Sequence, residues 1–537
     1  MVRTRTALLT IGGLLAGFAG LRMAGRLPRL EPRATSRALG DTADTTLGRS
    51  AARQCAAHPG LSGVQLLTDA PDAFAARVLL ASAAERSIDL QYYIWHGDRS
   101  GTLLLEALHE AAERGVRVRM LLDDNGIVGL DTVLAALDDH PNIEVRLFNP
   151  FAIRWPKPIG YLSDFSRLNR RMHNKSFTAD NQATIIGGRN IGDEYFGVGD
   201  GGLFADLDVL AIGPIVRDVS ADFDRYWTSM SAYPAAHILP RVGESHRARL
   251  AATASIVERD STASKYVAAL RDLPLIRQLM EGSEDLEWAK VRMISDDPAK
   301  ALGRAAPEMR LSGKLEGAIG TPQRSLSVIS GYFVPGKQGI AEFRRLAEGS
   351  VAISILTNAY EATDVGVVHA GYAPCRPALL EAGIRLFEMH KATRAAPASK
   401  ERRHASRLGI GSSLRGSGTG SMAALRSGAS MLHAKTFAVD RKRLFIGSFN
   451  FDPRSAELNT ELGFVIESPR LAAQVADAFE DAIPRHAYEV ASGDDGALRW
   501  IERRGSGDIV HAREPGIGAA EHLAVDVLAK LPVQWLL

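Results

Sequence analysis

The sequence carries one polar pattern twice, as RMHNKSFTADNQATIIGGRNIG at residues 171–192 and MLHAKTFAVDRKRLFIGSFNFD at residues 431–452. Each copy has the spacing H-x-K-x-x-x-x-D, followed by a glycine-led turn and an asparagine. The residues concerned are His173, Lys175, Asp180 and Asn190 in the first copy and His433, Lys435, Asp440 and Asn450 in the second. A pattern that recurs with its spacing intact predicts a duplicated structural unit.

The residue types in the pattern suit a phosphate diester. Alternate residues of a strand share a face, so the histidine and lysine of each copy point the same way. Two copies meeting about a pseudo-twofold axis would place two imidazoles and two ammonium groups around one site. The lysines would neutralise the phosphate charge, one histidine could attack phosphorus, and the other could protonate the leaving alkoxide.

The segments before each copy repeat as well. Strand-like and helix-like runs alternate over residues 87–95, 100–115, 116–124, 132–140 and 143–149, and again over residues 325–333, 339–349, 351–358, 376–383 and 384–389. This alternation is typical of βαβ units. We therefore predict the α/β class, with two similar lobes related by a pseudo-twofold axis, each a mixed or mostly parallel sheet flanked by helices.

The domain boundaries are predicted from composition. A chain of 537 residues is too long for one ordinary core. We expect an N-terminal signal or anchor segment, a linker, two lobes, and a flexible basic loop within the second lobe. These are, in order, residues 1–26, 27–60, 61–280, 281–537 and 391–430. Residues 217–322 have no recognisable counterpart in the other half.

The N-terminus and the overall composition restrict the cellular location and the kinds of ligand that the sequence predicts. Arg3 and Arg5 precede an apolar run over residues 7–21, which is the layout of a secretory signal. An uncleaved anchor, a cleaved signal and a disordered leader remain open, and the first two predict the bacterial cell envelope. A net charge of +2 does not indicate nucleic-acid binding. Cys55 and Cys375 are far apart, which argues against a structural zinc site or a disulfide framework and leaves one long-range disulfide open.

With these motifs the sequence resembles the phospholipase D superfamily and, within it, the bacterial cardiolipin synthases of the C type. Five stretches carry the resemblance: IDLQYYIWHGD, GGRNIGDEYF, LHAKTFAVD, IGSFNFDPRS and LNTELGFVIES. It implies transfer of a phosphatidyl group to phosphatidylglycerol through a phosphohistidine intermediate, without a metal or an organic cofactor. Phosphatidylglycerol and phosphatidylethanolamine both remain open as donors. The implied partners are membrane phospholipids at the bacterial inner membrane; a helper protein is an open question.

The resemblance also implies residue roles. His173 and His433 would be the nucleophile and the general acid, in an order left open. Lys175 and Lys435 would bind phosphate oxygens. The substrate-binding residues would be Asn190, Asn450 and Ser448, and Asp180 and Asp440 would organise the motif, although both could be plain turn residues. A carboxylate further along each half would orient its histidine and favour the charged ring: Glu461 in the second half and Asp206 in the first, with Asp208 as a competitor.

Other readings stay open at this stage. The same motif could hydrolyse phospholipid or nucleic acid, and a non-catalytic scaffold is a third possibility. The segment FNPFAIRWPKPIGYLSDFSRLNRR at residues 148–171 interleaves aromatic and basic residues, which is typical of either a membrane boundary or ordinary packing. The same two interpretations, membrane contact or ordinary packing, apply to four residues at the C-terminus: Val533, Trp535, Leu536 and Leu537. The basic run at residues 400–407 is read as a solvated loop, with anionic lipid binding as the alternative.

Overall fold

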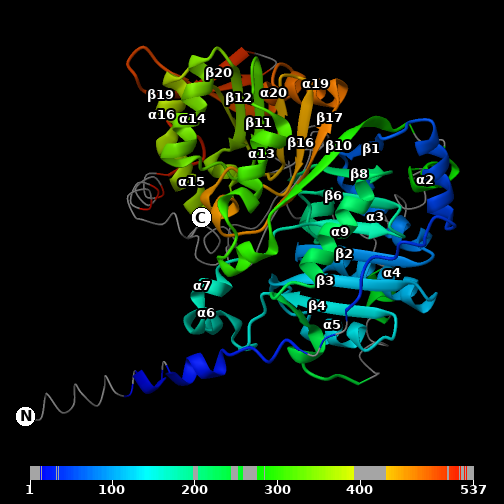
Figure 1. The fold of residues 1–537 in the computed structure, drawn as a ribbon. Coiled ribbons are helices and arrows are strands. Elements are labelled where there is room, and N and C mark those ends of the chain that lie inside the picture. Colours follow the sequence, from blue (N-terminus) through cyan, green and yellow to red (C-terminus); the bar gives the residue numbers. More distant parts are fainter. Residues whose placement is uncertain are drawn as a thin grey trace, which may run out of the picture.

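The computed structural model describes residues 13–528, except positions 14, 18, 32, 34 and 364 and the ranges 198–202, 244–251, 258–274, 283–284, 392–430, 505–506, 519–520, 522–524 and 526–527. Over these residues the chain forms two lobes, each with helices packed against a β-sheet (Figure 1). Among the helices that can be described, none combines the length and the apolar character needed to cross a bilayer.

The sheet of the first lobe is mixed. Its strands follow the order β1-β8-β6-β5-β2-β3-β4-β9, in which β2, β3 and β4 pair in parallel and the other neighbours are antiparallel. The parallel strands are those joined through helices, as a crossover connection requires. The strands are β1 Ser62–Leu67, β2 Ser87–Ile94, β3 Arg117–Gly126, β4 Ile143–Phe148, β5 Ser176–Ala179, β6 Ala183–Gly187, β8 Asp208–Ile212 and β9 Ala232–Pro234.

The second lobe repeats this order strand for strand. Its sheet runs β10-β17-β16-β15-β11-β12-β13-β18, again with three parallel strands, and continues into the antiparallel strands β19 and β20. The strands are β10 Glu287–Ser295, β11 Ser325–Ser330, β12 Ala352–Asn358, β13 Arg385–Met389, β15 Lys435–Val439, β16 Arg443–Gly447, β17 Leu462–Glu467, β18 Ala487–Ser492, β19 Leu498–Arg504 and β20 Gly507–His511. The predicted α/β class and duplicated lobes are confirmed.

The two sheets are joined into one, which the sequence did not predict. Residues 287–289 of β10 pair with β1 of the first lobe, and residues 290–295 pair with β17 of the second. β10 is therefore the counterpart of β1, and it lies in the region that had no recognisable repeat. A buried apolar cluster spans the junction, with Ile186 and Val209 from one lobe and Ile446 and Phe464 from the other. This shared core fixes the lobes relative to one another.

Helices pack against the sheet of each lobe through their apolar faces, as the sequence pattern predicted for α4 (Arg99–Glu113). In α4 the N-cap side chain of Asp98 accepts the Gly101 N–H, and the predicted apolar face, including Leu104, Leu105 and Leu108, is buried. The other main helices are α3 Ala70–Ala83, α5 Asp131–Asp138, α8 Asp193–Phe196, α9 Ile215–Trp227, α12 Leu275–Glu281, α13 Leu311–Ile319, α14 Gly336–Glu348, α15 Gly366–Tyr372, α16 Arg376–Glu381, α18 Pro453–Glu457, α19 Pro469–Ala478 and α20 Ile483–His486.

The predicted linker over residues 27–60 is more ordered than its composition indicated. It contains the helix α2 (Thr46–Ala56), whose N-cap residue Thr45 accepts the Gly48 N–H and which contacts α12. Upstream of α2, the Arg33 guanidinium donates to backbone carbonyls after α9, and the Ala38 N–H donates to Asp224. The predicted linker is therefore bound to the first lobe along these residues.

Several predictions fall outside the described residues. These are residues 1–12, 14 and 18 of the signal or anchor segment, the basic loop beyond Lys391, and the apolar C-terminal residues 533–537. They stay predictions.

Candidate active site

The aspartate of each motif lies in a tight hairpin turn. Asp180 follows β5 and Asp440 follows β15, and both have positive φ, as do the residues after them. This is the backbone that two-residue hairpin turns favour, and aspartate tolerates it better than most residues. The Asp180 carboxylate accepts the backbone N–H groups of residues 85–87, and Asp440 accepts those of residues 323–325. Each aspartate thereby ties its hairpin to the start of the neighbouring antiparallel strand, β2 or β11, consistent with an organising role.

We predict that Asp180→Ala destabilises the fold. The change leaves three N–H groups without their acceptor and puts alanine at positive φ, which should lower the free energy of unfolding by about 3 kcal/mol. Chemical denaturation measures this, with Asp180→Asn as the milder control because it keeps an acceptor oxygen. A variant of unchanged stability that has lost all activity would contradict the structural role.

Each histidine is positioned by backbone from the other lobe. The short strands β7 (Phe204–Ala205) and β14 (Met431–Leu432) pair in parallel across the lobes, and Met172 forms the equivalent bridge to Thr460. The His173 N–H donates to the Thr460 carbonyl, and the His433 N–H donates to the Ala205 carbonyl. These crossed contacts bring the two motifs face to face.

The two imidazoles lie next to each other in the interior. The ring centroids of His173 and His433 are 6.2 Å apart with an edge-to-face orientation. Only 6% of His173 and 2% of His433 is exposed. The predicted meeting of the two motifs is therefore present in the structure.

The carboxylates that contact the histidines cross between the lobes. His173 Nδ1 lies 2.8 Å from Glu461 Oε2, and His433 Nδ1 lies 3.1 Å from Asp206 Oδ2. The expected residues are present, but the expectation that each serves the histidine of its own half is wrong. The cause is the backbone pairing above, which lays the residue before each carboxylate against the opposite histidine. With Nδ1 engaged, Nε2 of each ring is the nitrogen that can face a substrate.

Asp208, the competitor for Asp206, has a different partner set. Its carboxylate accepts from the buried guanidinium groups of Arg77 and Arg189 and from the Arg189 N–H. It anchors the turn after β6 to α3, and Asp206 is the residue at the histidine.

Burial controls the charge of the site. The pKa of His173 and of His433 is well below the usual value, first because both rings are buried and then because Lys175 and Lys435 repel a proton. Burial also lowers the pKa of Lys175 to about 7 and raises that of Glu461 to about 7. Burial and the lysines thus oppose the charged form of the rings that the carboxylates were expected to favour. An anionic diester would favour the protonated form of both imidazoles and both lysines.

The lysines lie two residues after the histidines, Lys175 just before β5 and Lys435 at the start of β15. The Nζ of Lys175 donates to the His173 carbonyl at 2.5 Å, and the Nζ of Lys435 donates to the His433 carbonyl. Each lysine is thus held beside its own histidine, as the i, i+2 spacing predicted. Both are buried.

The predicted substrate-binding residues differ in their surroundings. The Asn190 amide accepts the Ile94 N–H and donates to the Tyr195 hydroxyl, so it already bonds to protein at both ends. Asn450 is buried, and its Oδ1 has no hydrogen-bond partner among the described residues. The Ser448 hydroxyl donates to Glu461. Substrate contact by these residues stays a prediction, best matched by Asn450.

Gly188 of the first copy stands where the second copy has Ser448, and this difference has a steric reason. A Cβ at this position would lie 1.7 Å from Asp206 Oδ1, whereas the equivalent Ser448 donates to the longer Glu461. The first lobe therefore pairs glycine with a carboxylate close to the turn, and the second pairs serine with glutamate. The shorter Asp206 in the first lobe therefore matches the absence of a serine side chain at Gly188.

Sequence reasoning missed two tyrosines and a supporting network. Tyr93 lies 5.0 Å from the His173 ring and Tyr332 lies 5.8 Å from the His433 ring, measured between centroids. Their signal was a tyrosine at the end of the first parallel strand of both halves. Asp296 was also missed: its carboxylate accepts the Glu461 N–H and bonds to Lys300. Nothing in its local sequence indicated this long-range contact.

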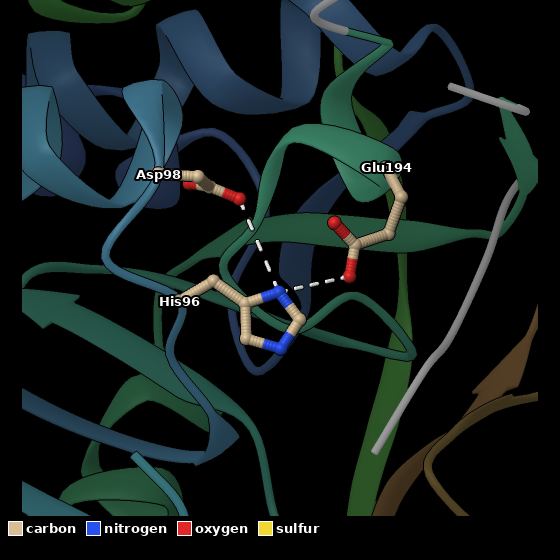
Figure 2. A group of neighbouring side chains, drawn as sticks. All are labelled: His96, Asp98 and Glu194. Carbon is tan, nitrogen blue, oxygen red and sulfur yellow. Dashed lines mark ion pairs between the residues drawn. The ribbon is translucent and has the colours of Figure 1, made fainter. Parts of the chain in front are cut away.

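A second histidine cluster lies at the end of β2. His96 Nδ1 is 3.0 Å from Glu194 and 3.9 Å from Asp98 (Figure 2). Within the described ranges this is the group whose ligand atoms could hold a metal ion. Asp98 already caps α4 and accepts the Asp193 N–H, and Glu194 raises the pKa of His96 by hydrogen bonding against the effect of burial. The cluster is explained as an ion pair that ties α8 to α4.

Two facing H-x-K-x-x-x-x-D motifs on a duplicated α/β fold define an enzyme of the phospholipase D class. The chain belongs to the family described as "Cardiolipin synthase, PLD-like domain", whose profile matches residues 78–227 and 315–483.

Relatives cover nearly the whole chain. Cardiolipin synthase C of Escherichia coli K12 is 47% identical over 483 residues, which is 90% of this chain and 98% of that protein. An uncharacterized protein of Helicobacter pylori J99 is 31% identical over 82% of this chain and 83% of its own length. The solved structure of phosphatidylserine synthase from Haemophilus influenzae Rd KW20 shares the fold, with a TM-score of 0.55 at 12% identity, over 90% of this chain and 98% of that one.

Proposed function

We propose that this enzyme makes cardiolipin by transferring a phosphatidyl group to phosphatidylglycerol through a phosphohistidine intermediate. The observation that carries the proposal is the buried pair of imidazoles, His173 and His433, each with Nδ1 on a carboxylate and each beside a lysine. The similarity to cardiolipin synthase C of Escherichia coli supports the lipid substrate.

The reaction needs one neutral and one protonated imidazole. Nε2 of the neutral ring attacks phosphorus and forms a P–N bond, while the P–O bond to the donor headgroup breaks and the leaving alkoxide takes the proton from the other ring. Lys175 and Lys435 stabilise the charge on the phosphoryl oxygens. The second ring, now neutral, removes the proton from a phosphatidylglycerol hydroxyl, whose oxygen attacks phosphorus and releases the first histidine.

The donor and the acceptor are tested together by mass spectrometry. Purified enzyme is incubated with vesicles that contain phosphatidylglycerol and phosphatidylethanolamine, each with a distinct isotope label in its headgroup and its phosphatidyl part. We expect labelled cardiolipin, and the label pattern identifies the donor. Phosphatidic acid as the main product would instead assign a hydrolase that gives the intermediate to water.

We also propose that the enzyme acts at the bacterial inner membrane.

We predict that activity survives metal chelation. The two lysines supply the positive charge that a metal would otherwise provide at the phosphoryl oxygens. Turnover of phosphatidylglycerol vesicles after dialysis against excess EDTA should stay within about two-fold of the untreated enzyme, since no step above requires a metal ion. The matched control is His96→Gln, which removes the imidazole from the ion-pair cluster and should leave EDTA sensitivity unchanged. Loss of activity on chelation with recovery on adding a divalent cation would reject the metal-free mechanism.

A further inference from the structure

We propose that the segment containing α6 and α7 is the surface through which this enzyme docks on a lipid bilayer, an inference that rests on the proposed function. The helices are α6 (Gly160–Ser163) and α7 (Phe165–Leu168). The docking patch consists of the exposed apolar side chains on and beside them: Val128, Trp155, Ile159, Leu162 and Phe165.

The patch is unusually exposed for apolar residues of this size. Trp155 is 88% exposed, Leu162 67% and Val128 66%. Large apolar side chains scattered singly over a surface need no explanation, but a group in one place indicates an interaction. Figure 1 shows α6 and α7 projecting from the first lobe, away from both sheets.

Ion pairs hold the patch together. The Arg154 guanidinium bonds to Asp131, which begins α5, and to Asp124 at the end of β3. These contacts bring the loop that carries Val128 against the segment that carries Trp155. The Tyr161 and Phe165 rings are also in contact, with centroids 6.2 Å apart. The exposed apolar side chains are therefore carried by two segments that are held next to each other.

Ion pairs also neutralise three of the basic residues beside the patch. Arg154, Lys157 and Arg167 are each paired with an aspartate and are less than one fifth exposed. The alternative that these basic residues reach lipid headgroups is thus not supported by the contacts. An apolar surface whose charges are internally satisfied is suited to insert among acyl chains, with tryptophan at the boundary.

The patch is linked to the candidate site. The Tyr161 hydroxyl donates to Asn125 Oδ1, a hydrogen bond to Asn125 also lowers the otherwise raised pKa of Tyr93, and the Tyr93 ring contacts His173. From α7 the chain runs only a few residues to His173. A bilayer held at the patch would therefore present its phospholipids beside the imidazoles.

A helical segment with exposed apolar residues, interrupted by Arg22, leaves the first lobe at the same place. Residues 19–24 are helical and largely exposed, with Met23 67% exposed. The helix ends at Gly25, where an added Cβ would lie 2.3 Å from the Ser163 hydroxyl of α6. Figure 1 shows this helix running away from the lobes below α6. Two exposed apolar elements that meet at one point favour a bilayer over a protein partner or a second copy of the chain.

Bromolipid quenching of tryptophan fluorescence tests the contact without requiring turnover. The probe is the full chain with vesicles of phosphatidylglycerol and phosphatidylcholine that carry brominated acyl chains. The difference between wild type and Trp155→Phe isolates the Trp155 signal, which should be quenched by the vesicles. Because insertion is apolar, quenching should change by less than about two-fold between low and high salt. An unquenched Trp155, or an emission shift with protein concentration alone, overturns the proposal.

Turnover gives a second readout. The double change Trp155→Ser and Leu162→Ser should lower turnover of vesicle phosphatidylglycerol by at least about ten-fold, because two inserted side chains are lost. Turnover of monomeric short-chain phosphatidylglycerol should stay unchanged. Val510→Ser, which removes a 60% exposed residue from β20 of the other lobe, is the matched control. Equal losses on both substrates would overturn docking, whereas quenching without any cardiolipin formation would reject the proposed function alone.

Discussion

Replacing His173 or His433 with asparagine is expected to lower cardiolipin formation by at least about 10⁴-fold, the size of effect seen when a nucleophile or its proton-transfer partner is removed. Both rings lie in the same buried site, and each would perform a step that the other cannot take over. Asparagine is close to histidine in shape and keeps a polar group there. The fold should therefore survive, which circular dichroism and thermal unfolding would verify.

The two variants should differ in what they accumulate. The variant that keeps the nucleophile but lacks the general acid can form the phosphohistidine slowly and then fails to activate the acceptor. Rapid acid quenching would destroy the P–N bond, so intact-protein mass spectrometry at neutral or alkaline pH is the suitable measurement. An adduct in one variant and none in the other assigns the nucleophile. Near-normal turnover in either variant would contradict the two-histidine mechanism.

The repeated motif made the fold and the facing histidines predictable. Its residues recur with the same spacing in both halves, and a local pattern of alternating strands and helices surrounds each copy. Local patterns of this kind can be recognised in the sequence without knowledge of long-range contacts. Asp206 and Glu461 came instead from the resemblance to the phospholipase D superfamily, which implies a carboxylate for each histidine, placed here by aligning the strands that follow the motifs.

The crossed pairing could not be predicted, because it depends on contacts between distant residues. β7 and β14 have two residues each and carry no strand signal of their own, yet their pairing decides which carboxylate meets which histidine. β10 was missed for a related reason: it has no motif, and its role as a strand follows from partners in both lobes. The sequence of residues 148–171 likewise does not show that Arg154 is ion-paired. In the structure its guanidinium bonds to Asp124 and Asp131, which are distant in the sequence.

Replacing Glu461 with glutamine is expected to lower kcat by about 10³-fold with little change in KM. The Glu461 carboxylate accepts from His173 Nδ1, fixes the ring, and stabilises the positive charge that the ring acquires during proton or phosphoryl transfer. Glutamine matches its shape but carries no charge. Because burial raises the pKa of Glu461 to about 7, the carboxylate ionises as pH rises through that value. The kcat/KM of the wild type should therefore fall below about pH 7, and this acid limb should disappear in Glu461→Gln.

The crossed contact makes a sharper test possible, since Glu461 belongs to the second lobe and His173 to the first. If the contact acts in catalysis, Glu461→Gln should share the adduct pattern of His173→Asn, and Asp206→Asn should share that of His433→Asn. Ser448→Ala is the matched control, because it removes a hydrogen bond to Glu461 and keeps the carboxylate, so the acid limb should persist. Should Glu461→Gln instead follow His433→Asn, the carboxylate would act within its own lobe, and the crossed geometry would have no part in the reaction.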